Sequence, residues 1–73
     1  MYSKFFSERL RQARKNAEKS QIEVETDTGI NRASLSRYET GEREPSIETI
    51  GKLAEYYNVS IDWLFGNVVQ KKK

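Results

Sequence analysis

Arg32 and Arg37 are the residues whose type and spacing best suit a specific polar contact. A guanidinium group donates two parallel hydrogen bonds, which match the O6 and N7 acceptors of guanine in the major groove of DNA. Ala33 and Ser36 lie between them, where the alanine methyl suits a thymine methyl and the serine hydroxyl suits a base or a phosphate. A helix that is merely solvated more often carries Glu and Lys pairs, so these four residues favour a nucleic-acid contact over a plain surface.

These four residues fall on the second of two short helices predicted in the segment SQIEVETDTGINRASLSRYE. Ser20 is a suitable N-cap for a helix that opens at Gln21, and Glu23 stands where a capping box requires Glu or Gln. Gly29 ends this helix because glycine adopts a positive φ without a Cβ penalty, and Asn31 caps the next helix. Two helices joined by so short a turn have the layout of a helix-turn-helix, whose second helix enters the major groove.

Apolar residues at helical spacing predict which faces of the helices are buried. The inward positions of the two motif helices are Val24, Thr28, Ile30, Leu35 and Tyr38. The helix before the motif carries an apolar stripe of Phe6, Leu10, Ala13 and Ala17. A fourth helix, capped by Ser46 and stopped by Asn58, has an inner face of Ile47, Ile50, Leu53, Ala54 and Tyr57.

A short fifth helix is predicted from Ile61 to Phe65, with Ser60 as its cap and Gly66 as its end. Thr40, Gly41 and the polar run to Pro45 are expected to form the loop after the second motif helix. No segment predicts a strand. The chain therefore reads as an all-α domain of five helices over residues 1–66, followed by a basic tail, residues 67–73, that we expect to be frayed.

The runs FSERLRQAR, TGINRASLSRYETGEREPS and LAEYYNVSIDWLFGN, together with SQ, carry a resemblance to a known family. They resemble the Cro/repressor-type helix-turn-helix domains of phage repressors and the wider xenobiotic-response-element family. The resemblance covers Phe5 to about Asn67, and the matching positions include Arg14, Gln21, Gly29, Glu39, Gly41, Pro45 and SIDWL. It implies a compact, five-helix, lambda-repressor-like fold with the helix-turn-helix as helices 2 and 3.

The resemblance also implies roles for individual residues. Gln21 is expected to reach the DNA backbone through its amide and the helix N-terminus, and Asn31, Thr40 and Arg43 are phosphate candidates. Each of these three has a purely structural alternative: Asn31 only caps the helix, Thr40 only satisfies the helix end, and Arg43 is only a solvated side chain. Arg14 and Glu39 are expected to form a partly buried ion pair that ties the first helix to the recognition helix.

Two residues depart from the family pattern. Glu25 stands where the family has a small residue, most often Ala, at the point where the two motif helices press together. We expect its carboxylate to swing outward along its stem. Lys19, just before the Ser20 cap, replaces a residue that is frequently apolar.

Composition and charge narrow the function further. The 73 residues leave room for one domain with a modest core, and they include no cysteine and no histidine. The usual nucleophile and base pairs and the thiolate and imidazole metal ligands are therefore missing, so we predict no catalytic residue, no metal and no cofactor. No segment approaches the ~20 apolar residues that a membrane span needs, so we expect a cytoplasmic protein with no membrane partner.

The net charge is only +2, but residues 1–19 carry +4 and residues 20–30 carry −3. A polarised surface of this kind orients a protein toward phosphates despite a low net charge.

The expected partner is double-stranded DNA, bound by a homodimer on an inverted repeat, because related repressors pair two recognition helices roughly 34 Å apart. The predicted dimer surface is the apolar end around Trp63, Phe65, Val68 and Val69. The alternative is a protein-interaction or antitoxin-type module that uses an acidic face formed by Glu48 and Glu55 with an exposed Tyr56. Arg32 and Arg37 favour DNA, because a pure interaction module does not need them; an enzyme is the least favoured class.

Overall fold

The structure is a computed structural model that describes residues 4–66 of the chain. In this range the chain forms five α-helices and no strand: α1 Lys4–Asn16, α2 Gln21–Thr28, α3 Arg32–Thr40, α4 Ile47–Tyr57 and α5 Ile61–Leu64. The all-α, five-helix prediction is confirmed. The predicted tail, residues 67–73, and the predicted dimer residues Val68 and Val69 lie outside the described residues.

Polar side chains begin the helices, as their positions in the sequence predict. Ser20 and Glu23 form the capping box at α2: the Ser20 hydroxyl accepts a hydrogen bond from the Glu23 N–H at 3.1 Å, and the Glu23 carboxylate accepts one from the Ser20 N–H at 2.8 Å. Ser46 and Ser60 cap α4 and α5 in the same way, each accepting from the N–H three residues later. These bonds satisfy amide donors that have no partner within a helix.

Residues in the left-handed region end three of the helices. Gly29 ends α2 with φ 80°, and Gly41 ends α3 with φ 85°. Asn58 ends α4 with φ 60°, a conformation that asparagine tolerates better than most residues. The fifth helix is one residue shorter than predicted, because Phe65 is its C-cap rather than its last residue. Thr40 is the last residue of α3, so the loop begins at Gly41.

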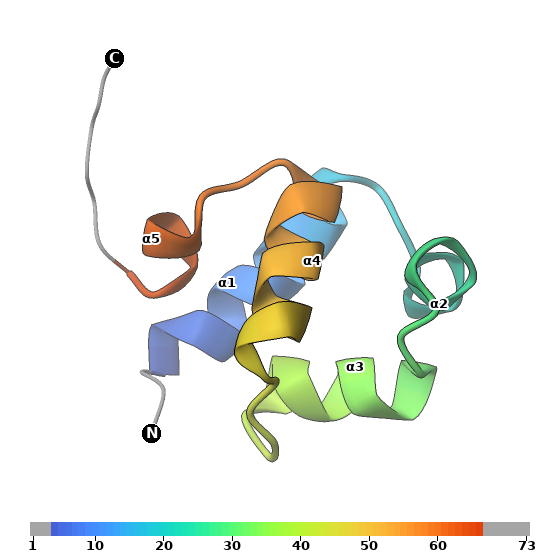
Figure 1. The fold of residues 1–73 in the computed structure, drawn as a ribbon, viewed down its shortest axis with the longest axis horizontal. Coiled ribbons are helices and arrows are strands. Elements are labelled where there is room, and N and C mark those ends of the chain that lie inside the picture. Colours follow the sequence, from blue (N-terminus) through green and yellow to red (C-terminus); the bar gives the residue numbers. More distant parts are fainter. Residues whose placement is uncertain (1–3, 67–73) are drawn as a thin grey trace.

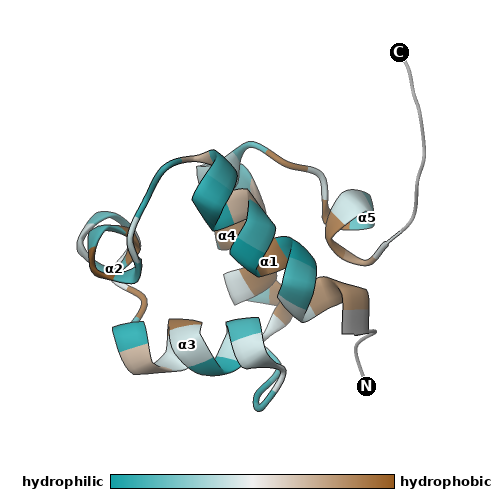
Figure 2. Cartoon of the chain, turned by 180° about the vertical axis from the view of Figure 1, so that it is seen from behind, coloured by the Kyte–Doolittle hydropathy of each residue, from teal (hydrophilic) through white to brown (hydrophobic). Residues whose placement is uncertain are grey.

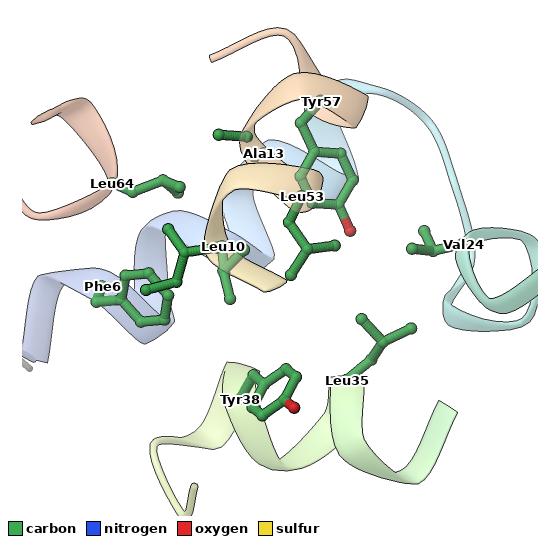
Figure 3. Close-up of a cluster of buried hydrophobic side chains, with 11 residues drawn as sticks. Phe6, Leu10, Ala13, Val24, Leu35, Tyr38, Leu53, Tyr57 and Leu64 are labelled. Carbon is green, nitrogen blue, oxygen red and sulfur yellow. The ribbon is translucent and has the colours of Figure 1, made fainter. Parts of the chain in front are cut away.

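The helices enclose one core, to which all five contribute. Figure 1 shows α4 crossing α1, with α3 lying across the base of both helices and α2 beside the N-terminal end of α3. Figure 3 shows apolar side chains from each helix converging on the space between them. The buried core residues are Phe6, Leu10, Ala13, Val24, Leu35, Tyr38, Ile50, Leu53, Ala54, Tyr57 and Leu64. This burial, rather than intrinsic helix propensity, stabilises helices as short as α2 and α5.

Ile47 corrects the prediction for the inner face of α4, because its side chain is 79% exposed. It occupies the first position of the helix, directly after the Ser46 cap. Side chains of a helix tilt toward its N-terminus, so the first residue projects beyond the end of the helix and past the core. Ile50, one turn further on, is 2% exposed. The inner face of α4 therefore begins at Ile50, three residues later than predicted, and the other predicted positions, Leu53, Ala54 and Tyr57, are buried.

An ion pair fastens α3 to α1. The Arg14 guanidinium donates to both carboxylate oxygens of Glu39, from Nε at 2.9 Å and from Nη2 at 3.0 Å. Its Nη1 donates to the carbonyl oxygen of Lys19 at 2.9 Å, so the α1–α2 connection is held by the same group. The hydrogen bond to Glu39 raises the pKa of Arg14, because it stabilises the charged guanidinium. Side-chain exposures of 14% for Arg14 and 5% for Glu39 place the pair largely out of water.

A second arginine of α1 holds α5. Arg9 donates from Nη1 to the carbonyl oxygen of Trp63 at 2.8 Å, and its guanidinium carbon lies 4.6 Å from the centroid of the Trp63 ring. Phe65 stacks on Phe6 with ring centroids 5.0 Å apart. Figure 2 shows hydrophobic residues gathered at this end of the molecule, where α5 meets the N-terminal end of α1.

Candidate nucleic-acid interface

The outer face of α3 carries the residues predicted to read bases. Arg32, Ala33 and Arg37 are exposed, whereas Ser36 is half-buried. Within residues 4–66, neither guanidinium forms an ion pair with a carboxylate. Both cationic groups therefore remain available to an external acceptor, while Leu35, Tyr38 and Glu39 on the opposite side of the same helix are buried.

A surface cavity lies where the start of α3 meets α2. Its volume is about 430 Å³. It is lined by Gln21, Glu25, Asn31, Arg32, Ala33 and Ser36. The structure thus brings five of the eight predicted contact residues into one hollow, and it adds Glu25, which the sequence did not assign to a contact. Arg37, Thr40 and Arg43 lie further along α3 and in the loop after it, outside this hollow.

The side chain of Gln21 is oriented by the Arg14–Glu39 ion pair. Its amide Nε2 donates to the Glu39 Oε1 atom at 3.2 Å, and the residue is half-buried at the first position of α2. Glu39 therefore accepts bonds from both Arg14 and Gln21. One N–H of the Gln21 amide is used inside the protein, so the orientation of this side chain depends on the α1–α3 attachment.

Asn31 and Thr40 each satisfy an end of α3. The Asn31 Oδ1 atom accepts from the Ala33 N–H at 2.7 Å and from the Ser34 N–H at 3.3 Å. The Thr40 hydroxyl donates to the carbonyl oxygen of Arg37 at 3.1 Å and accepts from the Glu42 N–H at 3.4 Å. Both residues are exposed, so the capping role leaves the Asn31 amide nitrogen at the surface. Arg43 is exposed in the loop, and only its backbone N–H bonds to Arg37.

Glu25 reaches the start of α3 rather than open solvent. The expected outward swing is incomplete: the residue is half-buried, and its Oε2 atom accepts a hydrogen bond from the Arg32 backbone N–H at 3.2 Å. This N–H belongs to the first residue of α3 and has no partner within the helix. A negative charge at this position also interacts favourably with the helix dipole. No spacing in the sequence indicates this contact, because it depends on the angle between α2 and α3.

Lys52 makes another contact that the sequence did not indicate. Its Nζ atom donates to the carbonyl oxygen of Thr28, the last residue of α2, at 3.1 Å. The Thr28 hydroxyl donates to the Val24 carbonyl oxygen and accepts from the Ile30 N–H. The turn between α2 and α3 is therefore fastened to α4 on the side away from the outer face of α3.

The proposed acidic docking face differs from its prediction at Tyr56. This residue is half-buried, and its hydroxyl donates to the Asp27 carboxylate. The hydrogen bond to Asp27 raises the pKa of Tyr56 to about 12. Glu48 and Glu55 are exposed, but the ring of Tyr56 packs against the core and forms an edge contact with Tyr57. Tyr56 is not the exposed aromatic side chain that a docking face requires.

The described part of the chain contains neither a metal site nor a membrane-spanning helix. Residues 4–66 contain no group of three or more acidic, cysteine or histidine side chains placed to hold a metal ion. None of the helices in that range is both long enough and apolar enough to cross a bilayer.

Two helices joined by a tight turn, with the outer face of the second left open, define a helix-turn-helix domain. A family model described as Helix-turn-helix matches residues 10–64, and the chain belongs to this family, in its Cro/C1-type branch. The fold is similar to the crystal structure of the P22 c2 repressor protein in complex with a synthetic operator. The TM-score is 0.79 and the sequence identity 26%, over 89% of this chain and 98% of the P22 chain.

Regulators of bacterial and phage origin are similar in sequence. The chain is 40% identical over 65 residues to the HTH-type transcriptional regulator ImmR of Bacillus subtilis (strain 168). This match covers 89% of this chain and 51% of ImmR. It is 39% identical over 59 residues to the cryptic phage CTXphi transcriptional repressor RstR of Vibrio cholerae serotype O1, covering 81% of this chain and 53% of RstR. The chain spans about half the length of the curated relatives it matches.

Proposed function

We propose that this chain is a sequence-specific, double-stranded DNA-binding transcriptional regulator of repressor type, which reads the major groove with α3. The observation that carries the proposal is the exposed pair Arg32 and Arg37, free of carboxylate partners in residues 4–66, on a helix whose other side is buried. The similarity to the P22 c2 repressor, a protein solved with its operator, supports it. The activity is binding rather than catalysis, and it takes place in the cytoplasm, where it is directed at phage, mobile-element or bacterial promoters.

In this proposal the residues of the interface divide into two groups. Arg32 and Arg37 donate to guanine, Ala33 contacts a thymine methyl, and Ser36 forms a hydrogen bond with a base or a phosphate. Gln21, Asn31, Thr40 and Arg43 contact phosphates, which fix the register of α3 in the groove without reading sequence. The exposed side of Asn31 lets it cap α3 and contact a phosphate at the same time.

The experiment compares Arg37→Ala with Arg43→Ala on a selected site and on random duplex DNA over a range of salt concentrations. Arg37→Ala is expected to weaken binding to the preferred site by about 1–3 kcal/mol and to flatten the preference at one base pair. Arg43→Ala is expected to weaken binding equally on both DNAs, and to reduce the slope of log K against log salt by about 1. An Arg37→Ala protein that keeps its full base preference would remove Arg37 from the readout.

The active species in this proposal is a homodimer on an inverted repeat. The two recognition helices then lie one helical turn apart, roughly 34 Å. Trp63 and Phe65 are half-buried at the α1–α5 end, beside Phe5, which is 50% exposed, and Ile61, which is 45% exposed. This apolar end is the proposed dimer surface. If selection from random duplexes recovers only single, non-repeated sites, or if one protein binds each duplex, the dimer is wrong.

A further inference from the structure

Glu25 places a carboxylate inside the proposed DNA interface, in addition to accepting the N–H at the start of α3. It lies one turn after Gln21 on α2 and lines the same cavity as Arg32, Ala33 and Ser36. Its position is fixed, because one carboxylate oxygen accepts the backbone N–H of Arg32 at 3.2 Å. In residues 4–66 it forms no ion pair with a lysine or arginine. A negative charge therefore stands among the residues that face the DNA.

This charge limits what part of the DNA can approach the start of α3. The N-terminus of a helix ordinarily favours an anion, and a phosphate is a common occupant of such a position. Here Glu25 already supplies the anion and accepts from the first amide of α3, so a phosphate placed directly at the Arg32 N–H would meet a like charge. The phosphates proposed to contact Gln21 and Asn31 must therefore approach those two side chains away from the Glu25 carboxylate. The group that approaches Glu25 must instead be a hydrogen-bond donor, because an ionised carboxylate only accepts.

The major-groove edges of the bases offer two such donors, N4 of cytosine and N6 of adenine. Adenine presents its N6 next to the N7 acceptor, which faces a carboxylate unfavourably, whereas cytosine presents N4 without a neighbouring acceptor. A carboxylate therefore suits cytosine, and an amide, which both donates and accepts, suits adenine.

We propose that Glu25 is a specificity-determining residue of this interface, whose carboxylate accepts a hydrogen bond from N4 of a cytosine at the N-terminal end of α3. The proposal rests on the proposed function and deepens it, since it names one base of the operator. It also explains how the cavity combines a cation with an anion. Arg32 selects acceptors and Glu25 selects a donor, so a C·G pair that is read on both bases satisfies both side chains.

The test measures binding of the full chain to a panel of duplexes that carry each of the four base pairs at each position of the selected site. Wild-type protein is expected to prefer cytosine about tenfold at one position near that affected by Arg32→Ala. Glu25→Ala is expected to abolish this preference, so that the four base pairs at that position bind about equally. Glu25→Gln is expected to shift it toward adenine, because the amide pairs with N6 and N7 together.

The Glu25→Gln variant separates recognition from capping. Its amide oxygen still accepts from the Arg32 N–H, so the protein stays folded even where Glu25→Ala does not. Glu55→Gln is the matched control, since it removes the same charge from an exposed position on α4. Both Glu25 variants are expected to bind random duplex DNA several-fold more tightly, because they remove the carboxylate charge that repels a nearby phosphate. Glu55→Gln is expected to leave the base preference unchanged and to change the affinity for random DNA less than either Glu25 variant does.

Two results would overturn the proposal, and they differ from failure of DNA recognition itself. If Glu25→Gln keeps the wild-type preference at every position, Glu25 reads no base. If Glu25→Ala weakens binding equally on all duplexes and lowers the melting temperature, Glu25 is only a cap of α3. A wild-type protein that shows no base preference anywhere would instead contradict the proposed function, and Glu25 with it.

Discussion

Two arginines of α1 attach two different helices by different chemistry. Arg14 binds the Glu39 carboxylate of α3 through two hydrogen bonds, and both side chains are largely removed from water. Arg9 binds α5 through the carbonyl oxygen of Trp63 and through the face of its ring, and it makes no ion pair in residues 4–66. The first attachment depends on two opposite charges and the second on one charge with neutral partners.

This difference determines how each attachment responds to a single substitution. A buried ion pair contributes little net stability, but the loss of one partner leaves an uncompensated charge in a poorly hydrated place. Arg9 is half-buried, so its loss exposes the Trp63 ring and a carbonyl oxygen to water without stranding a charge. The α3 side, which carries the proposed DNA face, is therefore the more fragile of the two.

The largest effect is expected for Arg14→Met. This change leaves the 5% exposed Glu39 carboxylate without its cation, so the free energy of unfolding should fall by about 3–5 kcal/mol. A fall of that size is a large share of the stability of a small domain. Thermal unfolding followed by circular dichroism measures it, and the double variant Arg14→Met with Glu39→Leu should recover part of the loss. A variant that melts like the wild type but no longer binds DNA would show that Arg14 is a contact residue.

A smaller effect is expected for Arg9→Met. The methionine keeps much of the aliphatic contact with Trp63 but loses the hydrogen bond and the cation–π interaction, so stability should fall by about 1–2 kcal/mol. Trp63 fluorescence should also shift to longer wavelength, because water reaches the ring. Arg9→Lys, which retains the charge, serves as the control. A loss as large as that of Arg14→Met would remove the distinction between the two attachments.

Tyr57→Phe probes the surroundings of the Arg14–Glu39 pair, because the Tyr57 hydroxyl interacts electrostatically with both charges, and the change removes neither of them. The Tyr57 hydroxyl is buried and has no hydrogen-bond partner among residues 4–66, and burial raises its pKa by disfavouring the phenolate. Its removal should raise the free energy of unfolding by about 0.5–1 kcal/mol, because an unsatisfied polar group no longer has to be desolvated. A clear destabilisation, measured by urea unfolding, would mean that the hydroxyl supports the Arg14–Glu39 pair.

The smallest effect is expected at Tyr56, which joins α4 to α2 through Asp27. Its pKa is raised to about 12, mainly by that hydrogen bond, above the value near 10 of an unfolded chain. The contribution to stability is therefore complete below about pH 10 and is lost as the pH rises toward 12. Ultraviolet titration of the phenol should show this late ionisation, and Asp27→Asn should return the pKa of Tyr56 toward 10. An unchanged titration in Asp27→Asn would exclude the hydrogen bond as its cause.

Most of the helix layout was predictable because the signals that begin and end helices act over two to four residues. Ser20, Asn31, Ser46 and Ser60 cap the helices as predicted, since each bond depends only on nearby sequence. The prediction that Ile47 belongs to the inner face of α4 is wrong, because periodicity does not say where a helix end lies relative to the neighbouring helices.

The contacts that position the candidate site were harder to predict, because they join side chains from separate elements. The bonds from Gln21 to Glu39 and from Lys52 to Thr28 span 18 and 24 residues. Which polar group reaches which depends on the angles between helices, and these follow from the packing of the whole core. The Arg14–Glu39 pair was expected through the family resemblance rather than from spacing. The DNA-contact roles of the α3 residues stay predictions.

The contact between α1 and α5 also bears on the order in which the chain folds. The hydrogen bond from Arg9 to Trp63 joins residues 54 positions apart, whereas Arg14 and Glu39 are 25 positions apart. Closing the longer loop is more unfavourable by about 0.7 kcal/mol, and the four-residue α5 offers little to offset it early. We therefore expect α5 to dock after the folding transition state. In kinetic terms, loss of Arg9 would speed unfolding while leaving the folding rate nearly unchanged.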